Sequence, residues 1–183
     1  MEAQGTIGQT RVGVSKKAVK LQNGASLLSQ MQTTAISTRT LSWWVKLSDV
    51  GQTSGGFGLS HDFDDAFESI VWNERAYDEG WFFGSSGYSR SDYVRHLASS
   101  IQPDVWYMVT AVYGSDYSMY VDGALLFTIP NANYLQTFQN YYRYVVGPRS
   151  YSIYGSRGYI DGAVGDVMVR VIFLFISFIT FLY

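Results

Sequence analysis

The segment from Trp106 to Gly123, WYMVTAVYGSDYSMYVDG, constrains the fold more than any other part of the chain. Residues 106–113 are almost entirely apolar or aromatic, and the turn-forming triplet Gly-Ser-Asp follows at 114–116. Residues 117–121 form a second apolar and aromatic run, which ends at Asp122-Gly123. Successive side chains of a strand point to opposite faces, and Asp-Gly between two such runs is a strong hairpin signal. The segment therefore predicts consecutive strands joined by tight turns.

The remainder of the chain continues this pattern of short strands between turns. Aromatic residues make up 17% of the 183 residues, 18 residues are glycine, and no long stretch has the period of an amphipathic helix. The expected strands lie at 38–47, 56–60, 67–74, 80–84, 93–98, 105–113, 117–121, 124–129, 142–147 and 163–170. This pattern predicts an all-β sandwich or barrel, and the length suits one domain with a sizeable core.

Four segments, in the required order, resemble the laminin G-like domains of the concanavalin A-like lectin/glucanase superfamily, the group that also contains the pentraxins. They are KAVKL with GASL between 17 and 27, ISTRTLSWWVKL at 36–47, the segment 106–123, and YIDGAVGDVMV at 159–169. The resemblance implies an antiparallel jelly-roll β-sandwich, concanavalin A-like, over residues 1–170. It also implies an extracellular or surface-associated protein, although no signal peptide is visible at the start of this chain.

Residues 171–183 form an apolar C-terminal tail outside the family pattern. The sequence VIFLFISFITFLY carries no charge. As a helix it would extend about 20 Å, which is short of the roughly 30 Å hydrocarbon core of a bilayer. The tail is a short membrane anchor, a strand covered by the sandwich or by another subunit, or the product of an altered reading frame. We expect membrane contact only if it is an anchor.

Charge and cysteine content limit the partners. The net charge is −2 and no basic stripe is present, so we expect no nucleic-acid binding. The chain has no cysteine, which excludes disulfides, thiol catalysis and thiolate metal sites.

An acidic loop at 62–68 offers two kinds of chemistry besides that of a solvated loop. Calcium takes six to eight oxygen ligands, and calcium is held at one rim in many relatives, so we predict a Ca²⁺ site at Asp62, Asp64 and Asp65. Glycoside hydrolysis needs a flanking pair of carboxylates. Asp62, Asp64 and Glu68 do not reproduce the Glu-x-Asp-x-x-Glu spacing of laminarinase-like relatives, so we expect no catalysis here.

Aromatic residues are more numerous than a core of this size requires. We assign Trp43, Trp106 and Tyr120 to the core because they lie within the strands of the family signature. Tyrosine and tryptophan at loops present rigid, amphipathic surface for a ligand such as a sugar ring. The predicted carbohydrate-binding residues are Trp72, Trp81, Tyr88, Tyr93, Tyr141, Tyr142, Arg143, Tyr151 and Tyr154.

These observations favour a non-catalytic recognition module that binds carbohydrate or a glycosylated surface through rim loops and aromatic side chains. One alternative is a structural or adhesion domain of a surface or viral assembly, with a protein partner or a homo-oligomer. A second alternative is an atypical glycoside hydrolase.

Overall fold

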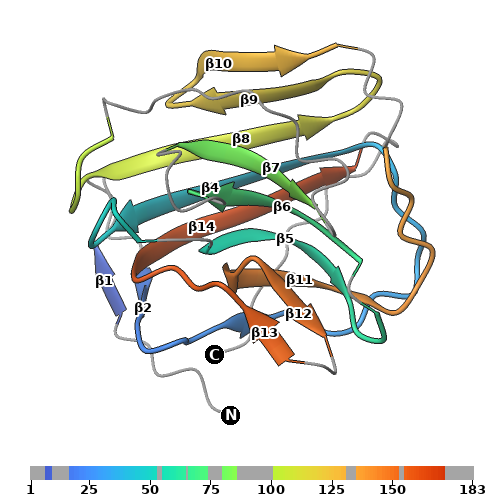
Figure 1. Ribbon diagram of the computed structural model, residues 1–183, viewed down its shortest axis with the longest axis horizontal. Coiled ribbons are helices and arrows are strands. Elements are labelled where there is room, and N and C mark those ends of the chain that lie inside the picture. The colour runs from blue at the N-terminus through green and yellow to red at the C-terminus, as the bar shows by residue number, and fades with distance from the viewer. Residues whose placement is uncertain are drawn as a thin grey trace.

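In the computed structural model, two antiparallel sheets pack face to face (Figure 1). The structure describes residues 7–9, 17–52, 55–64, 66–73, 80–85, 101–130, 135–152 and 155–171. The described residues contain strands and turns but no helix, which confirms the all-β sandwich. None of them forms a helix that is long and apolar enough to cross a membrane.

The larger sheet has seven strands in the order β1-β2-β14-β4-β8-β9-β10. Their bounds are β1 Ile7–Gln9, β2 Lys17–Leu21, β14 Gly162–Val171, β4 Arg39–Leu47, β8 Trp106–Tyr113, β9 Tyr117–Val121 and β10 Ala124–Ile129. The smaller sheet has the order β3-β11-β5-β6-β7, with β3 Leu27–Leu28, β11 Tyr142–Pro148, β5 Gly55–His61, β6 Phe67–Trp72 and β7 Trp81–Ser85. A separate hairpin consists of β12 (Ser150–Ser152) and β13 (Gly155–Arg157), and its strand β12 packs against β5 and β6.

The hairpin predicted at Asp122-Gly123 is confirmed. Both residues have positive φ, 50° and 83°, and Val121 pairs with Ala124 across the turn. Positive φ at both central positions is the requirement of a type I′ turn, which is why Asp-Gly joins β9 to β10. The expected strand at 93–98 lies outside the described residues. β14 extends to Val171, and residues 172–183 also lie outside them.

The core lies between the sheets and is rich in tryptophan. Alternate residues of β4 are buried, so Leu41, Trp43 and Val45 point inward while their neighbours are half-buried on the outer face. The ring of Trp43 lies 5.8 Å from that of Phe57 on β5 and 6.0 Å from that of Trp81 on β7, measured between centroids. The predicted core position of Trp43 is therefore confirmed.

The predicted core positions of Trp106 and Tyr120 are wrong. On β8 the inward side chains include Val109 and Ala111, and alternation places Trp106 on the outer face, where it is half-buried. The Lys46 ammonium lies 5.9 Å from its ring centroid. Tyr120 also points away from the core on β9 and is half-buried. These strands are apolar on both faces, so the sequence alone did not reveal which face is inside.

A buried ion pair joins the two sheets at one end of the sandwich. Arg39 at the start of β4 pairs with Glu68 on β6, and their side chains are 0% and 1% exposed. The guanidinium lies 4.6 Å from the ring centroid of Tyr113, and the hydroxyl of Tyr117 donates to Glu68 Oε1 at 3.3 Å. Burial lowers the pKa of Arg39, and the surrounding tyrosines oppose that effect. The same end carries the candidate site.

Candidate functional site

The β5–β6 hairpin meets the start of β11 at the right-hand end of the sandwich in Figure 1, and two exposed aromatic side chains and several charged ones gather there. Phe63 is 57% exposed and Tyr141 is 48% exposed, and few large hydrophobic side chains among the described residues are so accessible. We define the rim patch as His61, Asp62, Phe63, Asp64, Tyr141 and Arg143.

The β5–β6 hairpin fixes one side of the rim patch through its own hydrogen bonds. The amide of His61 donates to the carbonyl of Ala66 at 2.9 Å, which closes the turn. The carboxylate of Asp64 accepts a hydrogen bond from the amide of Ala66 at 2.8 Å and lies 3.2 Å from His61 Nδ1. A carboxylate that bonds the backbone two residues later is typical of turns. Phe63 is thereby presented at the tip.

Tyr141 fixes the other side with an unusual backbone. Its φ is 57°, in the left-handed region that favours glycine and asparagine. Its amide donates to the carbonyl of Gln32 at 2.8 Å, and its carbonyl accepts from the amide of Asp62 at 3.1 Å. The exposed ring stands edge to face with that of Phe63, with centroids 5.7 Å apart and an interplanar angle of 74°.

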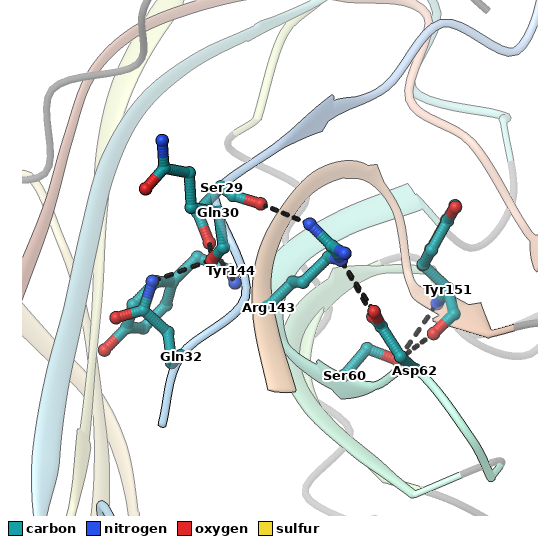
Figure 2. Close-up of polar contacts among 8 residues, drawn as sticks. All are labelled: Ser29, Gln30, Gln32, Ser60, Asp62, Arg143, Tyr144 and Tyr151. Carbon is teal, nitrogen blue, oxygen red and sulfur yellow. Dashed lines mark hydrogen bonds and ion pairs between the residues drawn. The ribbon is translucent and has the colours of Figure 1, made fainter. Parts of the chain in front are cut away.

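Arg143 and Asp62 form the charged centre of the rim patch. Arg143 lies on the outer face of β11 because Tyr142 and Tyr144, its neighbours, point into the core. Figure 2 shows its guanidinium between Ser29 and Asp62: Nη1 donates to the carbonyl of Ser29 at 3.0 Å, and Nε lies 2.9 Å from both carboxylate oxygens of Asp62. The side chains of Arg143 and Asp62 are 26% and 9% exposed.

The β12 strand is anchored beside this pair. Ser60 Oγ donates to the carbonyl of Tyr151 at 2.5 Å and accepts from the amide of Tyr151 at 3.0 Å, as Figure 2 shows. Ser69 Oγ donates to the carbonyl of Arg149 at 2.8 Å. These two serines, on the outer face of the five-stranded sheet, hold the segment 149–151 over β5 and β6. Tyr151, half-buried, is thus placed next to the rim patch.

The structure divides the predicted carbohydrate-binding residues into three groups. Tyr141 and Arg143 lie in the rim patch, and Tyr151 lies beside it. The predicted surface position of Trp72, Trp81 and Tyr142 is wrong, because these side chains are at most 2% exposed. Tyr88, Tyr93 and Tyr154 lie outside the described residues.

The buried members have structural partners of their own. Trp72 and Trp81 pack edge to face with centroids 4.9 Å apart, and Trp72 Nε1 donates to the carbonyl of Val50 at 2.9 Å. The hydroxyl of Tyr142 donates to the carbonyl of Thr34 at 3.0 Å, and burial raises the pKa of that hydroxyl. The satisfied polar tips of Trp72 and Tyr142 allow these two rings to be core residues, whereas Nε1 of Trp81 is buried without a hydrogen-bond partner among the described residues.

Sequence reasoning did not select Phe63 or Ser29. Phe63 stands between two aspartates, and the prediction treated the run only as a source of carboxylates. The signal that could have found Phe63 is an aromatic residue within a polar run at a hairpin tip. Such a residue is expected to be exposed, and an exposed large apolar side chain is informative. Ser29 contributes a backbone carbonyl to Arg143, and residue type carries no signal for such a contact.

The predicted calcium site stays a prediction. Among the residues that the structure describes, no group of three His, Cys, Asp or Glu side chains is arranged to hold a metal ion. The carboxylate of Asp62 accepts from Arg143, and that of Asp64 accepts from an amide. Asp65 lies outside the described residues. Ca²⁺ is coordinated by oxygen ligands. For it to bind here, Arg143 and the amide of Ala66 would have to release the carboxylate oxygens of Asp62 and Asp64.

The carboxylates of the hairpin have separate environments. Glu68 points into the core and pairs with Arg39, so it is out of reach of a surface ligand. Asp62 is engaged by Arg143 and Asp64 is 60% exposed. Within the described part of this hairpin, Glu68 and Asp62 are therefore each paired with an arginine.

Comparison with known proteins places most of the sandwich in one family. A family model of the laminin G type, described as the concanavalin A-like lectin/glucanases superfamily, matches residues 17–170. No curated protein sequence matches the chain significantly.

Solved structures share the fold at low sequence identity. Domain 4 of AbnA, an extracellular GH43 arabinanase from Geobacillus stearothermophilus solved with arabinotriose, is 16% identical with a TM-score of 0.59, over 93% of this chain and 76% of that one. A heptameric SAP-like pentraxin from Limulus polyphemus is 15% identical with a TM-score of 0.55, over 90% and 74%. The enzymatically active domain of tailspike protein 2 from bacteriophage CBA120 is 13% identical with a TM-score of 0.63, over 93% and 28%.

Proposed function

The chain belongs to the concanavalin A-like lectin/glucanase superfamily, and on this premise we propose that it is a non-catalytic module that binds carbohydrate through the rim patch. The observation that carries the proposal is the conformation and exposure of Tyr141. A left-handed backbone costs an L-residue with a side chain roughly 1–2 kcal/mol relative to the right-handed region. Tyr141 has this strained backbone, and the residue is still 48% exposed to water.

Stability alone gives a poor account of that arrangement. Glycine would relieve the backbone strain, and the exposed ring adds little burial to offset it. Strained residues cluster at ligand sites, where geometry is held for a purpose other than stability. The neighbouring exposed ring of Phe63 and the polar pair of Arg143 and Asp62 supply the other elements of a sugar site. The apolar face of a sugar stacks on an aromatic ring, and its hydroxyls bond charged side chains.

Two further features support this reading. The arabinanase domain was solved with arabinotriose, so a sandwich of this fold carries a sugar in that protein. In this chain, Glu68 and Asp62 are each paired with an arginine and Asp64 accepts a hydrogen bond from the hairpin backbone, which favours binding over hydrolysis. A site for glycans also fits an extracellular or surface-associated location, which we propose for this protein.

The second candidate is contact between copies of this chain through the outer face of the seven-stranded sheet. That face carries Trp44 opposite Met108 on neighbouring strands, with half-buried Trp106 nearby. Leu125 and Met168 are 58% and 41% exposed. If this face serves assembly, Met168→Glu converts an oligomer into a monomer in light scattering and leaves sugar binding unchanged.

A glycan array with matched variants tests the first candidate. Tyr141→Gly removes the ring and relieves the backbone, so we expect it to abolish binding while the melting temperature stays equal or rises. Leu125→Ala, an exposed side chain on β10 at the far edge of the other sheet, is the control and should bind as wild type does. Retained binding in Tyr141→Gly would place the sugar elsewhere. The absence of any glycan signal with wild-type protein would overturn the function.

A further inference from the structure

We propose that the rim patch selects neutral sugars and recognises a single sugar ring, which rests on the proposed function of this same patch. Three independent features lead to this ligand class. They are the balance of charge, the hydrogen-bonding capacity of the Arg143–Asp62 pair, and the angle between the two exposed rings.

The rim patch has no excess of positive charge. The positive charge of Arg143 is compensated by Asp62, whose two oxygens lie 2.9 Å from Nε. Asp64 adds another carboxylate, 60% exposed and 3.2 Å from His61 Nδ1. With neutral His61 the four side chains sum to one negative charge, and with protonated His61 they sum to zero. An anionic sugar would therefore meet a carboxylate without an uncompensated cation, which is unfavourable.

The charged pair matches the chemistry of hydroxyl groups. A guanidinium has five N–H donors. In the described structure Arg143 donates from Nε and Nη1, and its Nη2 bonds no described residue. Asp62 supplies carboxylate oxygens as acceptors beside these donors. A sugar hydroxyl both donates and accepts, so neighbouring hydroxyls can use both members of the pair. A carboxylate or sulfate group only accepts and would leave Asp62 unused or repelled.

The two exposed rings set the number of sugar units. Phe63 and Tyr141 meet at 74°, so they do not form one flat platform. A chain of sugars that lies along a surface needs coplanar faces in a row. Two rings in edge-to-face contact present one face to one sugar, with the second ring as a wall beside it. The site therefore contacts one ring at a time, and added sugar units contribute little affinity.

Ligand-observed NMR titration tests the ligand class directly. The neutral probes are the methyl glycosides of glucose, galactose, mannose and arabinose, and the anionic probes are glucuronic acid and N-acetylneuraminic acid. We expect the best neutral probe to bind at least about tenfold more tightly than either anionic probe. The trisaccharide of the best sugar should bind no more than about threefold more tightly than the methyl glycoside. A threefold gain is expected because any of three equivalent units can occupy the site, without any added contact.

Two asparagine variants in the β5–β6 hairpin separate the effect of the Arg143–Asp62 pair from the effect of an exposed carboxylate. Asp62→Asn releases the charge of Arg143, so we expect weaker binding of the neutral probe and tighter binding of glucuronic acid. Asp64→Asn removes an exposed carboxylate without releasing a cation, so it should tighten the binding of glucuronic acid less than Asp62→Asn does. Circular dichroism confirms that both variants remain folded.

The outcomes distinguish this inference from the function on which it rests. If an anionic probe binds best, or if affinity rises more than about tenfold from one unit to three, the inference fails and the sugar-binding function stands. If no probe binds to the wild-type protein and the glycan array is also blank, the proposed function fails and the inference fails with it.

Discussion

Replacing Glu68 by glutamine would leave the Arg39 guanidinium buried without its counter-ion. The two side chains are 0% and 1% exposed, so solvent cannot take the place of the lost charge. Glutamine keeps the shape of glutamate and an oxygen that can accept from Tyr117, which donates to Glu68 Oε1 in the wild type. The change therefore removes charge with little loss of volume or hydrogen bonding.

The expected loss is large for a domain of this size. Breaking a buried ion pair by removal of one partner costs about 3–5 kcal/mol, because the remaining charge is desolvated and unpaired. Most domains have a free energy of unfolding of about 5–15 kcal/mol, so the variant would keep only part of its stability. The double variant Arg39→Met with Glu68→Leu removes both charges, and we expect it to regain most of the loss.

Urea unfolding followed by tryptophan fluorescence measures this prediction. The buried tryptophans of the core report global unfolding, and an unchanged slope against urea shows that the midpoint shift is a change in stability. Asp64→Asn, an exposed carboxylate on the same hairpin, is the control and should change stability by less than about 0.5 kcal/mol. A loss below about 1 kcal/mol in Glu68→Gln would refute the assignment of a dry, charged pair that joins the sheets.

Four other predictions follow from the described structure. Trp43→Ala should cost about 3–5 kcal/mol and Trp106→Ala far less, as measured by urea unfolding, because only the first ring is buried; equal losses would contradict the facing of β8. Burial raises the pKa of Tyr144 above its ordinary value of 10.0. The contribution of its protonated hydroxyl to the free energy of unfolding is therefore complete below that pH and is lost as the pH rises further. A Tyr144→Phe variant should show a shallower alkaline fall in melting temperature. If Asp62, Asp64 and Asp65 hold calcium, millimolar Ca²⁺ raises the melting temperature where Na⁺ at matched ionic strength does not, and Asp64→Asn abolishes the rise. An unchanged melting temperature of the wild-type protein would contradict the calcium site. A chain that ends at Val171, the last residue of β14, should keep its β signal in circular dichroism and be more soluble than the full chain; loss of the signal would make the tail part of the core.

Alternation and turn chemistry made most of the fold predictable. The strands β4, β8, β9 and β10 lie within a residue of their predicted bounds, because each ends at a turn with a strong local signal such as Asp122-Gly123. Side-chain facing was harder to predict. Residues 106–113 are apolar on both faces, since the outer face of the seven-stranded sheet is itself rich in apolar side chains. The side chains alternate there with the period of a strand, but this alternation does not show which of the two sets faces the core.

The candidate site shows the same limit at the scale of single residues. The cluster at 141–143 was predicted as one binding group from its composition. The strand period sends Tyr142 into the core and Arg143 outward, and the left-handed turn at Tyr141 exposes a ring just before β11. The partners Asp62 and Phe63 come from a hairpin far away in sequence. Their proximity depends on the pairing of β5 with β11, which no local pattern encodes.

Phe138 connects the buried ion pair to the rim patch. Its ring centroid is 5.3 Å from the guanidinium carbon of Arg39 on one side and 5.1 Å from the ring of His61 on the other. The core therefore supports the hairpin that presents Phe63, and a rigid support is what a site needs when its ligand offers few contacts. A folded Glu68→Gln variant should consequently lose sugar affinity, although the substitution lies inside the core. Leu125→Ala should not, because its side chain lies on the distant edge strand β10.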